Sequence, residues 1–313
     1  MTLPLVILCF HRILPESHCV GPDKPYFLRQ TALSLERFRL LLDEIESHAH
    51  VLPPEALFEW LKGAQVTDRP GVVLTFDDGY ADIVTFALPE LQRRHSRAIV
   101  CITTATMFED YTLPVDRWYA TIHAAMVRRG TLSGLGVEPW TFDLDRDEDF
   151  ARLIDGPEKR AFVQANAVEQ EKLLQCLERA FGVHTRPPVP KMLDVEQLRM
   201  LEERGFILGA HGHHHLHLPR LSDEIASYEL ERSHSFFPNH GLSTTPILAY
   251  PDGATSGRIE ELARAQGFSV GLALGSRPAT RDDSPLHLPR FIPTNDPSWF
   301  TRRLLPLFTS GER

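Results

Sequence analysis

Short apolar runs alternate with amphipathic stretches over most of this sequence. The apolar runs have the length of buried strands and are rich in Val, Ile and Leu, which is typical of a parallel sheet covered on both faces. They occupy residues 3–10, 71–76, 98–103, 206–210, 247–250 and 269–274. Between them, residues 35–47 carry apolar side chains at the i, i+3 and i+4 spacing of a helix, and residues 259–266 form another helical stretch that ends at Gly267. Asp194 and Gln197 have the spacing of a capping box at the start of a further helix.

This alternation predicts an α/β fold with a parallel sheet, either open or closed into a barrel. In such folds the functional side chains lie at the carboxyl ends of the strands. Polar residues that directly follow an expected strand are His11, Asp77, Asp78 and His211, and Tyr250 is the last residue of another. We therefore expect these residues to lie at one common site.

Residues 112–190 break the alternation of strands and helices. This segment looks helical at 117–129 and 165–180, with an irregular acidic stretch at 143–149 and a Pro-rich end at 186–190. A strand-containing half lies on each side of it. We interpret residues 1–313 as a single domain in which 112–190 form a mainly helical insertion at the barrel rim, where such insertions often shape substrate access.

The overall composition is that of a globular protein. Apolar residues make up 42% and charged residues 24%, and the formal net charge is −9. This acidic balance argues against nucleic acid or an anionic membrane surface as the main partner. Cys9 and Cys101 lie within apolar runs and are most simply buried thiols. No apolar run has the length of a transmembrane helix, and the first ten residues lack the basic start and cleavage site of a signal peptide. The expected location is the cytoplasm, including the periphery of the inner membrane.

The pair Asp77-Asp78, followed by Gly79, offers the clearest chemistry. Ionised carboxylates at the end of an apolar strand are costly unless a metal, a proton or hydrogen bonds compensate them. A cluster of five histidines between residues 211 and 217 supplies further metal ligands. One Asp and two His form a suitable ligand set for a catalytic divalent ion. The alternative is a turn-forming Asp-Asp-Gly together with a His-rich loop that binds nothing.

Three segments together resemble the polysaccharide deacetylase family, the carbohydrate esterases that share a NodB-homology domain. They are Thr75-Phe76-Asp77-Asp78-Gly79, His211-x-x-x-His215 and Ala249-Tyr250-Pro251-Asp252-Gly253, in the order and spacing of that family. Phe10-His11-Arg12-Ile13 and Leu288-Pro289-Arg290 also resemble the branch that acts on bacterial exopolysaccharides and surface glycans. The resemblance implies a distorted (β/α) barrel and metal-dependent removal of acetyl groups from N-acetylated sugars.

The resemblance also implies a role for each matching residue. Asp78, His211 and His215 would hold the divalent ion, Zn²⁺ by ligand type, although Co²⁺ or Ni²⁺ would also suit them. Asp77 would be the general base that takes a proton from the attacking water. His11 would be the general acid for the departing amine, with His287 as the alternative.

The remaining roles concern the substrate and the base. Tyr250, Pro251 and Asp252 would border the substrate, and the backbone N–H of Asp252 would help to hold the developing oxyanion. Many family members have an arginine at the position of Ala249 that tethers the base, and we expect Arg290 to replace it. A second departure is Gly212, where the family usually has a Ser or Thr that steadies the loop, so another side chain must do so or the metal is held less tightly.

The expected function is removal of N-acetyl groups from a sugar of a bacterial surface polysaccharide or of its lipid- or nucleotide-linked precursor. An esterase acting on O-acetyl groups, or an amidohydrolase acting on a non-sugar amide, would use the same metal and base. A carbohydrate-binding homologue that has lost activity is the alternative outside the enzymes.

Overall fold

The computed structural model describes residues 5–108 and 110–309 of the chain. Within these residues, seven parallel strands form a nearly closed barrel in the spatial order β1-β5-β6-β9-β10-β11-β12. The strands are β1 (Leu5–Phe10), β5 (Gly71–Phe76), β6 (Ile99–Ile102), β9 (Ile207–Ala210), β10 (Ile247–Ala249), β11 (Val270–Leu274) and β12 (Leu288–Arg290). A short strand, β4 (His50–Val51), pairs with the beginning of β5. The expected distorted (β/α) barrel is confirmed.

The barrel closes between its first and last strands. The N–H of Cys9 donates to the carbonyl oxygen of Phe291 at 2.8 Å, and the N–H of Phe291 donates to the carbonyl oxygen of Ile7 at 2.9 Å. The six strands expected from apolar runs are all present with small shifts at their ends, although residues 3 and 4 of the first lie outside the described residues. The closing strand β12 was not among the expected strands.

Side chains of the strands alternate between the inside of the barrel and the surrounding helices. Leu5 and Ile7 of β1 belong to an inner cluster that also contains Trp60 of α3 (Ala56–Leu61). Val6 and Leu8 belong to an outer cluster that contains the apolar face of α2 (Leu35–His48). Both faces of the sheet are therefore buried, which explains the continuous apolar runs in the sequence.

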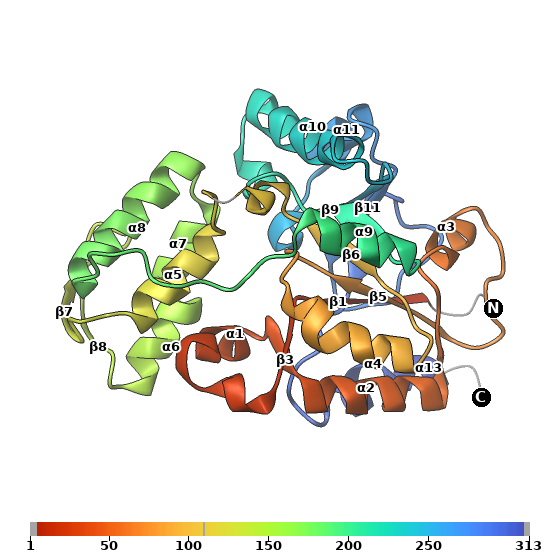
Figure 1. The fold of residues 1–313 in the computed structure, drawn as a ribbon, viewed down its shortest axis with the longest axis horizontal. Coiled ribbons are helices and arrows are strands. Elements are labelled where there is room, and N and C mark those ends of the chain that lie inside the picture. The colour runs from red at the N-terminus through yellow and green to blue at the C-terminus, as the bar shows by residue number, and fades with distance from the viewer. Residues whose placement is uncertain (1–4, 109, 310–313) are drawn as a thin grey trace.

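Helices surround the barrel on its outer side (Figure 1). Besides α2 they are α4 (Leu88–Arg93), α9 (Val195–Glu203), α10 (Asp223–Asn239), α11 (Gly257–Ala265), α12 (Trp299–Arg303) and α13 (Leu305–Thr309). The predicted capping box is present at the start of α9, where Gln197 N–H donates to Asp194 Oδ1 at 2.8 Å and Asp194 N–H donates to Gln197 Oε1 at 3.0 Å. None of the helices in the described ranges is both long and apolar enough to span a membrane.

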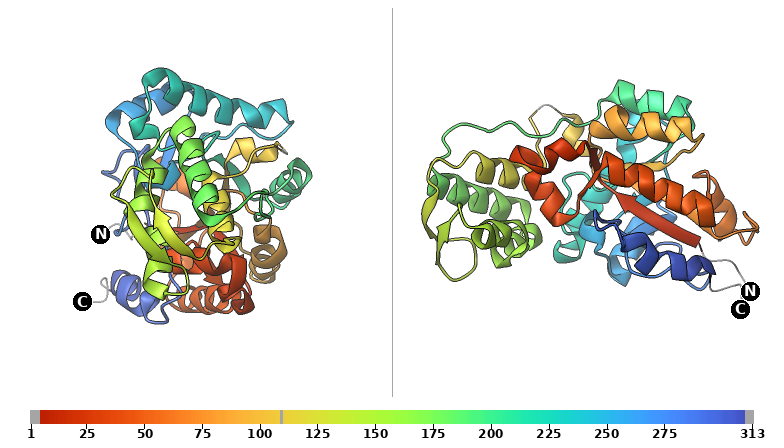
Figure 2. Two further views of the ribbon diagram at one scale, coloured as in Figure 1. Left: turned by 90° about the vertical axis from the view of Figure 1, so that its left-hand side faces the viewer. Right: turned by 90° about the horizontal axis from the view of Figure 1, so that it is seen from below.

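Residues 112–190 form a group of elements beside the barrel (Figures 1 and 2). It contains α5 (Pro114–His123), β7 (Arg129–Leu132), β8 (Trp140–Asp143), α6 (Asp147–Asp155), α7 (Pro157–Gln164) and α8 (Ala167–Phe181). The hydrophobic core of this group includes Tyr26 of α1 (Lys24–Arg29) and Tyr80, which follows β5. The group is thus packed on segments that leave the carboxyl ends of the barrel strands.

Two details of this segment differ from the sequence-based expectation. The first helix ends at His123 instead of continuing to 129, because residues 129–132 pair with residues 140–143 as an antiparallel hairpin. The acidic stretch 143–149 is not irregular throughout, since α6 begins at Asp147. Three acidic residues occupy the first turn of α6, where they face the positive end of the helix dipole.

Candidate metal centre and active-site cavity

Asp77 and Asp78 lie directly after β5, at the carboxyl end of the barrel. The N–H of Asp77 donates to the carbonyl oxygen of Phe10 at 2.8 Å and so continues the pairing between β1 and β5. The backbone then turns sharply, because Asp78 adopts a left-handed conformation with φ 71°. This turn gives two adjacent carboxylates different partners, although both are buried at 2% and 6% exposure.

The Asp78 carboxylate meets two imidazoles from the segment that follows β9. Its Oδ1 lies 3.3 Å from His211 Nε2 and 3.5 Å from His215 Nε2, and the ligand atoms of the three residues lie within 4.8 Å of one another. Ligand atoms about 2.1 Å from a shared tetrahedral ion would be about 3.4 Å apart. The spacing of these atoms therefore suits a single divalent ion.

Two further observations favour a metal at this position. Asp78 Oδ1 is buried and has no hydrogen-bond partner among the described residues, which is costly for an ionised oxygen. His211 Nδ1 lies 2.9 Å from the carbonyl oxygen of Ala249. Because a carbonyl only accepts, Nδ1 carries a proton, which leaves Nε2, on the side of Asp78, as the nitrogen that can bind an ion. Asp78, His211 and His215 therefore fit the divalent ion that the sequence suggested.

Asp77 is held by Arg290 of β12. Arg290 Nη1 donates to Asp77 Oδ1 at 2.8 Å and Nη2 donates to Oδ2 at 2.7 Å, so the ion pair is bidentate. Arg290 Nη1 also donates to Thr75 Oγ1 at 2.9 Å, and the Cys9 thiol donates to Asp77 Oδ2 at 3.3 Å. Asp77 Oδ2 lies 3.9 Å from His211 Nε2, so this fixed carboxylate borders the cluster formed by Asp78, His211 and His215.

The surroundings set the charge of these groups. Burial alone would raise the pKa of Asp77, but the Arg290 guanidinium and the nearby His211 outweigh it and hold that pKa well below its ordinary range. Burial also opposes ionisation of Asp78, yet the contact with His211 and the charge of His11 lower its pKa. Burial is the main cause that lowers the pKa of His215. Both carboxylates are therefore ionised at neutral pH, and His215 is neutral, as metal binding requires.

The segment from His211 to His215 is steadied by Glu229 of α10. Glu229 is 1% exposed, and its Oε2 accepts the backbone N–H groups of His213 at 3.2 Å and His214 at 2.7 Å. Its Oε1 lies 2.6 Å from His214 Nδ1. These contacts occur where the sequence lacks the expected Ser or Thr.

The backbone conformation at position 212 explains why this residue is glycine. It adopts φ +73°, and a Cβ at this position would lie 3.3 Å from Cγ of Pro251. A Ser or Thr would be strained there, whereas Gly adopts this conformation freely.

In the segment Tyr250-Pro251-Asp252, the first residue lies in the core and the last lines the cavity. Tyr250 is fully buried, and its hydroxyl donates to the carbonyl oxygen of Leu286 at 2.8 Å, while Pro251 packs behind the histidine segment. Asp252 lines the cavity, and its Oδ2 lies 3.6 Å from His217 Nδ1.

Backbone strain is concentrated at this site. Asp252 has φ 56° and His215 has φ 55°, so with Asp78 the site contains three of the five non-glycine residues with positive φ in the described ranges. Strained non-glycine residues often mark functional sites.

A cavity of about 300 Å³ lies over these groups. Asp77, Asp78, His211, His215 and Arg290 line it together with residues of α1, α5 and α7. His11 lines it as well, and its Nδ1 is buried without a hydrogen-bond partner in the described residues. His287 is instead exposed, with Nδ1 2.9 Å from Glu260 Oε1, and does not line the cavity.

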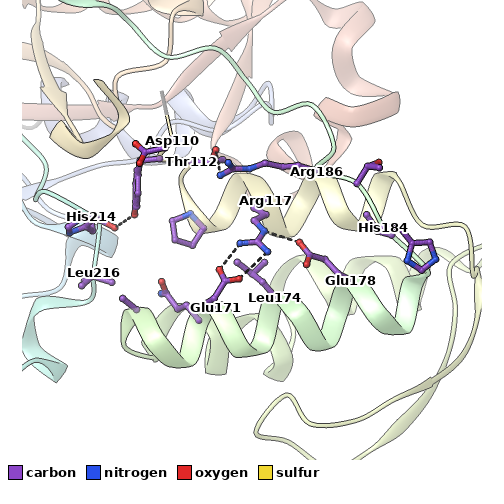
Figure 3. Close-up of a pocket in the computed structure, with 16 residues that line it drawn as sticks. Asp110, Thr112, Arg117, Glu171, Leu174, Glu178, His184, Arg186, His214 and Leu216 are labelled. Carbon is purple, nitrogen blue, oxygen red and sulfur yellow. Dashed lines mark hydrogen bonds and ion pairs between the residues drawn. The ribbon is translucent and has the colours of Figure 1, made fainter. Parts of the chain in front are cut away.

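A second, larger cavity of about 580 Å³ lies beside α5 and α8 (Figure 3). Three of its charged side chains pair with one another: Arg117 donates to Glu171 at 2.6 Å and to Glu178 at 2.8 Å. The hydroxyl of Tyr111 on its wall donates to the carbonyl oxygen of His214 at 2.7 Å, which ties this region to the histidine segment. Because neither Asp77 nor Asp78 lines it, the smaller cavity is the candidate active site.

Residues 157–271 match the sequence model of the family described as polysaccharide deacetylase. The resemblance to polysaccharide deacetylases is confirmed. The matched region contains the histidine segment and the motif around Pro251, whereas Asp77 and Asp78 precede it and are brought to it by the fold. No sequence among the curated proteins matches the chain.

Several solved structures have a fold similar to that of this chain. The deacetylase PplD of Streptococcus pyogenes, in complex with acetate, has a TM-score of 0.63 at 15% identity, with 98% of this chain and 100% of that chain covered. IcaB of Ammonifex degensii has a TM-score of 0.58 at 18% identity, with coverage of 95% and 94%. A de-N-acetylase of Aggregatibacter actinomycetemcomitans has a TM-score of 0.59 at 13% identity, with coverage of 93% and 95%.

Two residues near the candidate active-site cavity were not found by sequence reasoning. Glu229 looks like an ordinary polar position in a helix, yet it lies on the same stripe as the buried residues Ala226, Leu230 and Ser233 of α10. A carboxylate on the apolar face of a helix was the sequence signal that could have identified Glu229. Lys159 of α7 is buried against the cavity, and nothing in its local sequence distinguishes it from a surface lysine.

Proposed function

We propose that the protein is a metal-dependent hydrolase that removes N-acetyl groups from a sugar of a bacterial surface polysaccharide or of its precursor. The main observation behind this proposal is that two adjacent carboxylates have different surroundings, one suited to a metal ligand and the other to a general base. Asp78 faces two imidazoles, its Oδ1 has no hydrogen-bond partner in the part of the chain that the structure describes, and Asp77 is fixed beside them by Arg290. Binding alone would need no immobilised carboxylate next to a metal site.

Asp78, His211 and His215 would hold the ion, for which Zn²⁺ is the first candidate and Co²⁺ or Ni²⁺ are alternatives. When bound, a divalent ion at this position supplies Lewis acidity toward the acetyl carbonyl and lowers the pKa of water. Every remaining task falls to side chains and backbone groups of the chain itself.

Asp77 takes one proton from the attacking water, and Arg290 keeps the carboxylate in one orientation while it does so. The new C–O bond forms first and places negative charge on the carbonyl oxygen. When the C=O bond forms again, the amide C–N bond breaks and His11 gives a proton to the departing nitrogen. The backbone N–H of Asp252 faces the negative charge that develops on the carbonyl oxygen. The products are acetate and a sugar with a free amine.

Removal of an N-acetyl group is favoured over the alternatives by the fold neighbour described as a de-N-acetylase. The test uses the full chain loaded with Zn²⁺ or Co²⁺ and measures acetate release from three substrate classes: N-acetylated oligosaccharides, O-acetylated sugars and simple acetamides. Preferential release from the N-acetylated sugars supports the proposal. Preferential release from O-acetylated sugars would make the protein an esterase, and no release from any class with the metal bound would favour a binding protein.

A further inference from the structure

The end of the cavity formed by α1 and α7 is rich in positive charge. Arg29 of α1 and both Lys159 and Arg160 of α7 line it, together with the carboxylate of Asp155. Arg29 Nη1 lies 3.4 Å from Asp155 Oδ1, and Arg160 Nη2 donates to the carbonyl oxygen of Asp155 at 2.9 Å. Both arginines are exposed, so water and Asp155 satisfy them.

Lys159 is in a different situation. It is 3% exposed, and its Nζ is buried without a hydrogen-bond partner among the described residues. The ammonium instead faces three aromatic rings, at 4.9 Å from the centroid of Phe162, 5.0 Å from Tyr119 and 5.8 Å from Trp118. Ring faces attract a cation, but they do not accept the three N–H bonds that an ammonium offers.

A buried cation normally has an anionic partner, since removing it from water is costly. Burial lowers the pKa of Lys159 to about 7, although the charge of Asp252 acts in the opposite direction. An anion placed beside Nζ would restore the charged form and provide the missing acceptors. A neutral hydroxyl would offset much less of the desolvation, because hydrogen bonds between two charged groups are the stronger ones.

We propose that Lys159 binds an anionic oxygen group carried by the N-acetylated sugar, either the carboxylate of a uronic acid or a phosphate. This inference rests on the proposed function and adds the substrate class to it. Lys159 lines the same cavity as Asp77 and Asp78, so one substrate molecule can place its acetyl group at the carboxylates and its anionic group at the lysine. The insertion, through α7, would then select the sugar.

The test compares substrates that differ only in charge. The metal-loaded protein is assayed with the methyl glycoside of N-acetylglucosamine, with its C6-carboxylate analogue and with N-acetylglucosamine 1-phosphate. The measured quantity is the ratio of kcat/KM for each anionic sugar to that for the neutral one. We expect Lys159→Met to lower this ratio roughly tenfold for the preferred anionic sugar, mainly through KM, as expected for loss of a charge-assisted contact.

Lys172→Met is the matched control, because Lys172 is an exposed lysine on α8 that does not line the cavity. It should leave the ratio unchanged. Lys159→Met should not lower Tm, since it removes a buried ammonium that has no hydrogen-bond acceptor among the described residues. A purely structural lysine would lower Tm when replaced and leave the ratio unchanged. The sugar whose ratio falls tells whether the anion is a carboxylate or a phosphate. An unchanged ratio for both anionic sugars overturns the proposal.

A binding measurement separates this inference from the proposed function. Calorimetry with methyl glucuronoside, glucose 1-phosphate and methyl glucoside needs no acetyl group and no turnover. If no substrate is deacetylated but Lys159→Met still weakens binding of an anionic sugar, the proposed function fails and the anion site stands. Equal affinities of the wild type and the variant for all three sugars would overturn the anion site.

Discussion

At the scale of single residues, Asp77 and Asp78 are adjacent but differ in what compensates their charge. Arg290 neutralises Asp77 through two hydrogen bonds in a fully buried ion pair. Asp78 Oδ1 has no hydrogen-bond partner among the described residues and faces the imidazoles of His211 and His215. Without a metal, the Asp77 carboxylate stabilises the fold. The desolvation of Asp78 is not compensated by a hydrogen bond to Oδ1 and therefore destabilises it.

This contrast predicts different effects of two isosteric substitutions. In the metal-free protein, Asp77→Asn should lower the free energy of unfolding by about 3 kcal/mol, because it leaves the buried Arg290 without a counter-charge. Asp78→Asn should leave it unchanged or raise it. Urea denaturation in the presence of a chelator measures both effects.

The same two variants separate the proposed roles once metal is added. Asp78→Asn should lose the bound ion, and Asp77→Asn should retain it while turnover falls by about 10²–10⁴-fold. Equal loss of metal in both variants would contradict the assignment of base and ligand.

His11 and His287 allow a further test at this scale. His11 lines the cavity with a buried Nδ1 that lacks a partner in the described residues, whereas His287 pairs with Glu260 outside it. His11→Gln should reduce turnover by about 10²–10⁴-fold with unchanged metal content, the range for loss of a general acid. His287→Gln is the control and should retain activity. The reverse pattern would transfer the acid role to His287.

At the scale of elements, α10 acts on the site through one side chain. Glu229 accepts two backbone N–H groups from the histidine segment and so fixes the chain between His211 and His215. Groups that orient metal ligands from behind typically change metal affinity 10–100-fold when they are lost.

Glu229→Ala should therefore weaken Zn²⁺ binding by about 10–100-fold, measured by competition with a chromogenic chelator. Glu229→Gln retains an oxygen that can accept both N–H groups and should lose less affinity. Glu231→Ala changes an exposed glutamate of the same helix and is the control. Equal Zn²⁺ affinity in all of these proteins would show that the segment holds its shape without Glu229.

The contact between α4 and α2 predicts a dependence of stability on pH. Hydrogen bonds from Arg93 are the main cause that lowers the pKa of Glu90 to about 2, with Arg94 and Arg39 contributing. Because the folded pKa lies below the unfolded one, the stabilisation is complete above about pH 5 and is lost as the pH falls toward 2. Since the arginine partners Arg93 and Arg39 are half-exposed or more, solvent screens part of it.

Glu90→Gln should therefore lower the free energy of unfolding on the order of 2 kcal/mol at pH 7, and this difference should shrink below pH 4. Urea titrations of both proteins from pH 7 to pH 3 measure it. Glu59→Gln, which removes an exposed ion pair with Lys62, should show no comparable difference. A Glu90→Gln difference that stays constant with pH would contradict the electrostatic explanation.

The elements differ in how far the sequence could predict them. Strands buried on both faces leave a continuous apolar run, so β1, β5 and β11 were found within two residues of their ends. Strand β12 leaves no such run, because it has three residues, of which Pro289 lacks an N–H and Arg290 is charged. Its place in the barrel is decided by tertiary pairing with β11 and β1, which local patterns do not encode.

At the scale of the whole molecule, the site depends on contacts between residues that are far apart in the chain. Arg290 and Asp77 are 213 positions apart, and local patterns contain no signal for their contact, which only the family resemblance led us to expect. Resemblance to known motifs could place Asp78, His211 and His215 together, since each belongs to a short recognisable segment. Lys159 and Glu229 belong to no such motif, and their burial follows only from how α7 and α10 pack on the barrel.

A metal at Asp78, His211 and His215 would connect the ends of β5 and β9, so its binding should stabilise the entire barrel. Zn²⁺ at about 100 times its Kd should add about 2.7 kcal/mol to the free energy of unfolding, which corresponds to an increase in Tm of about 4 °C for a chain of this size. Thermal unfolding followed by circular dichroism, with and without chelator, measures the increase. Asp78→Asn should abolish it, whereas His217→Gln, outside this ligand group, should retain it. An equal increase in wild type and Asp78→Asn would mean that the ion binds elsewhere, and the proposed hydrolytic site would lose its metal.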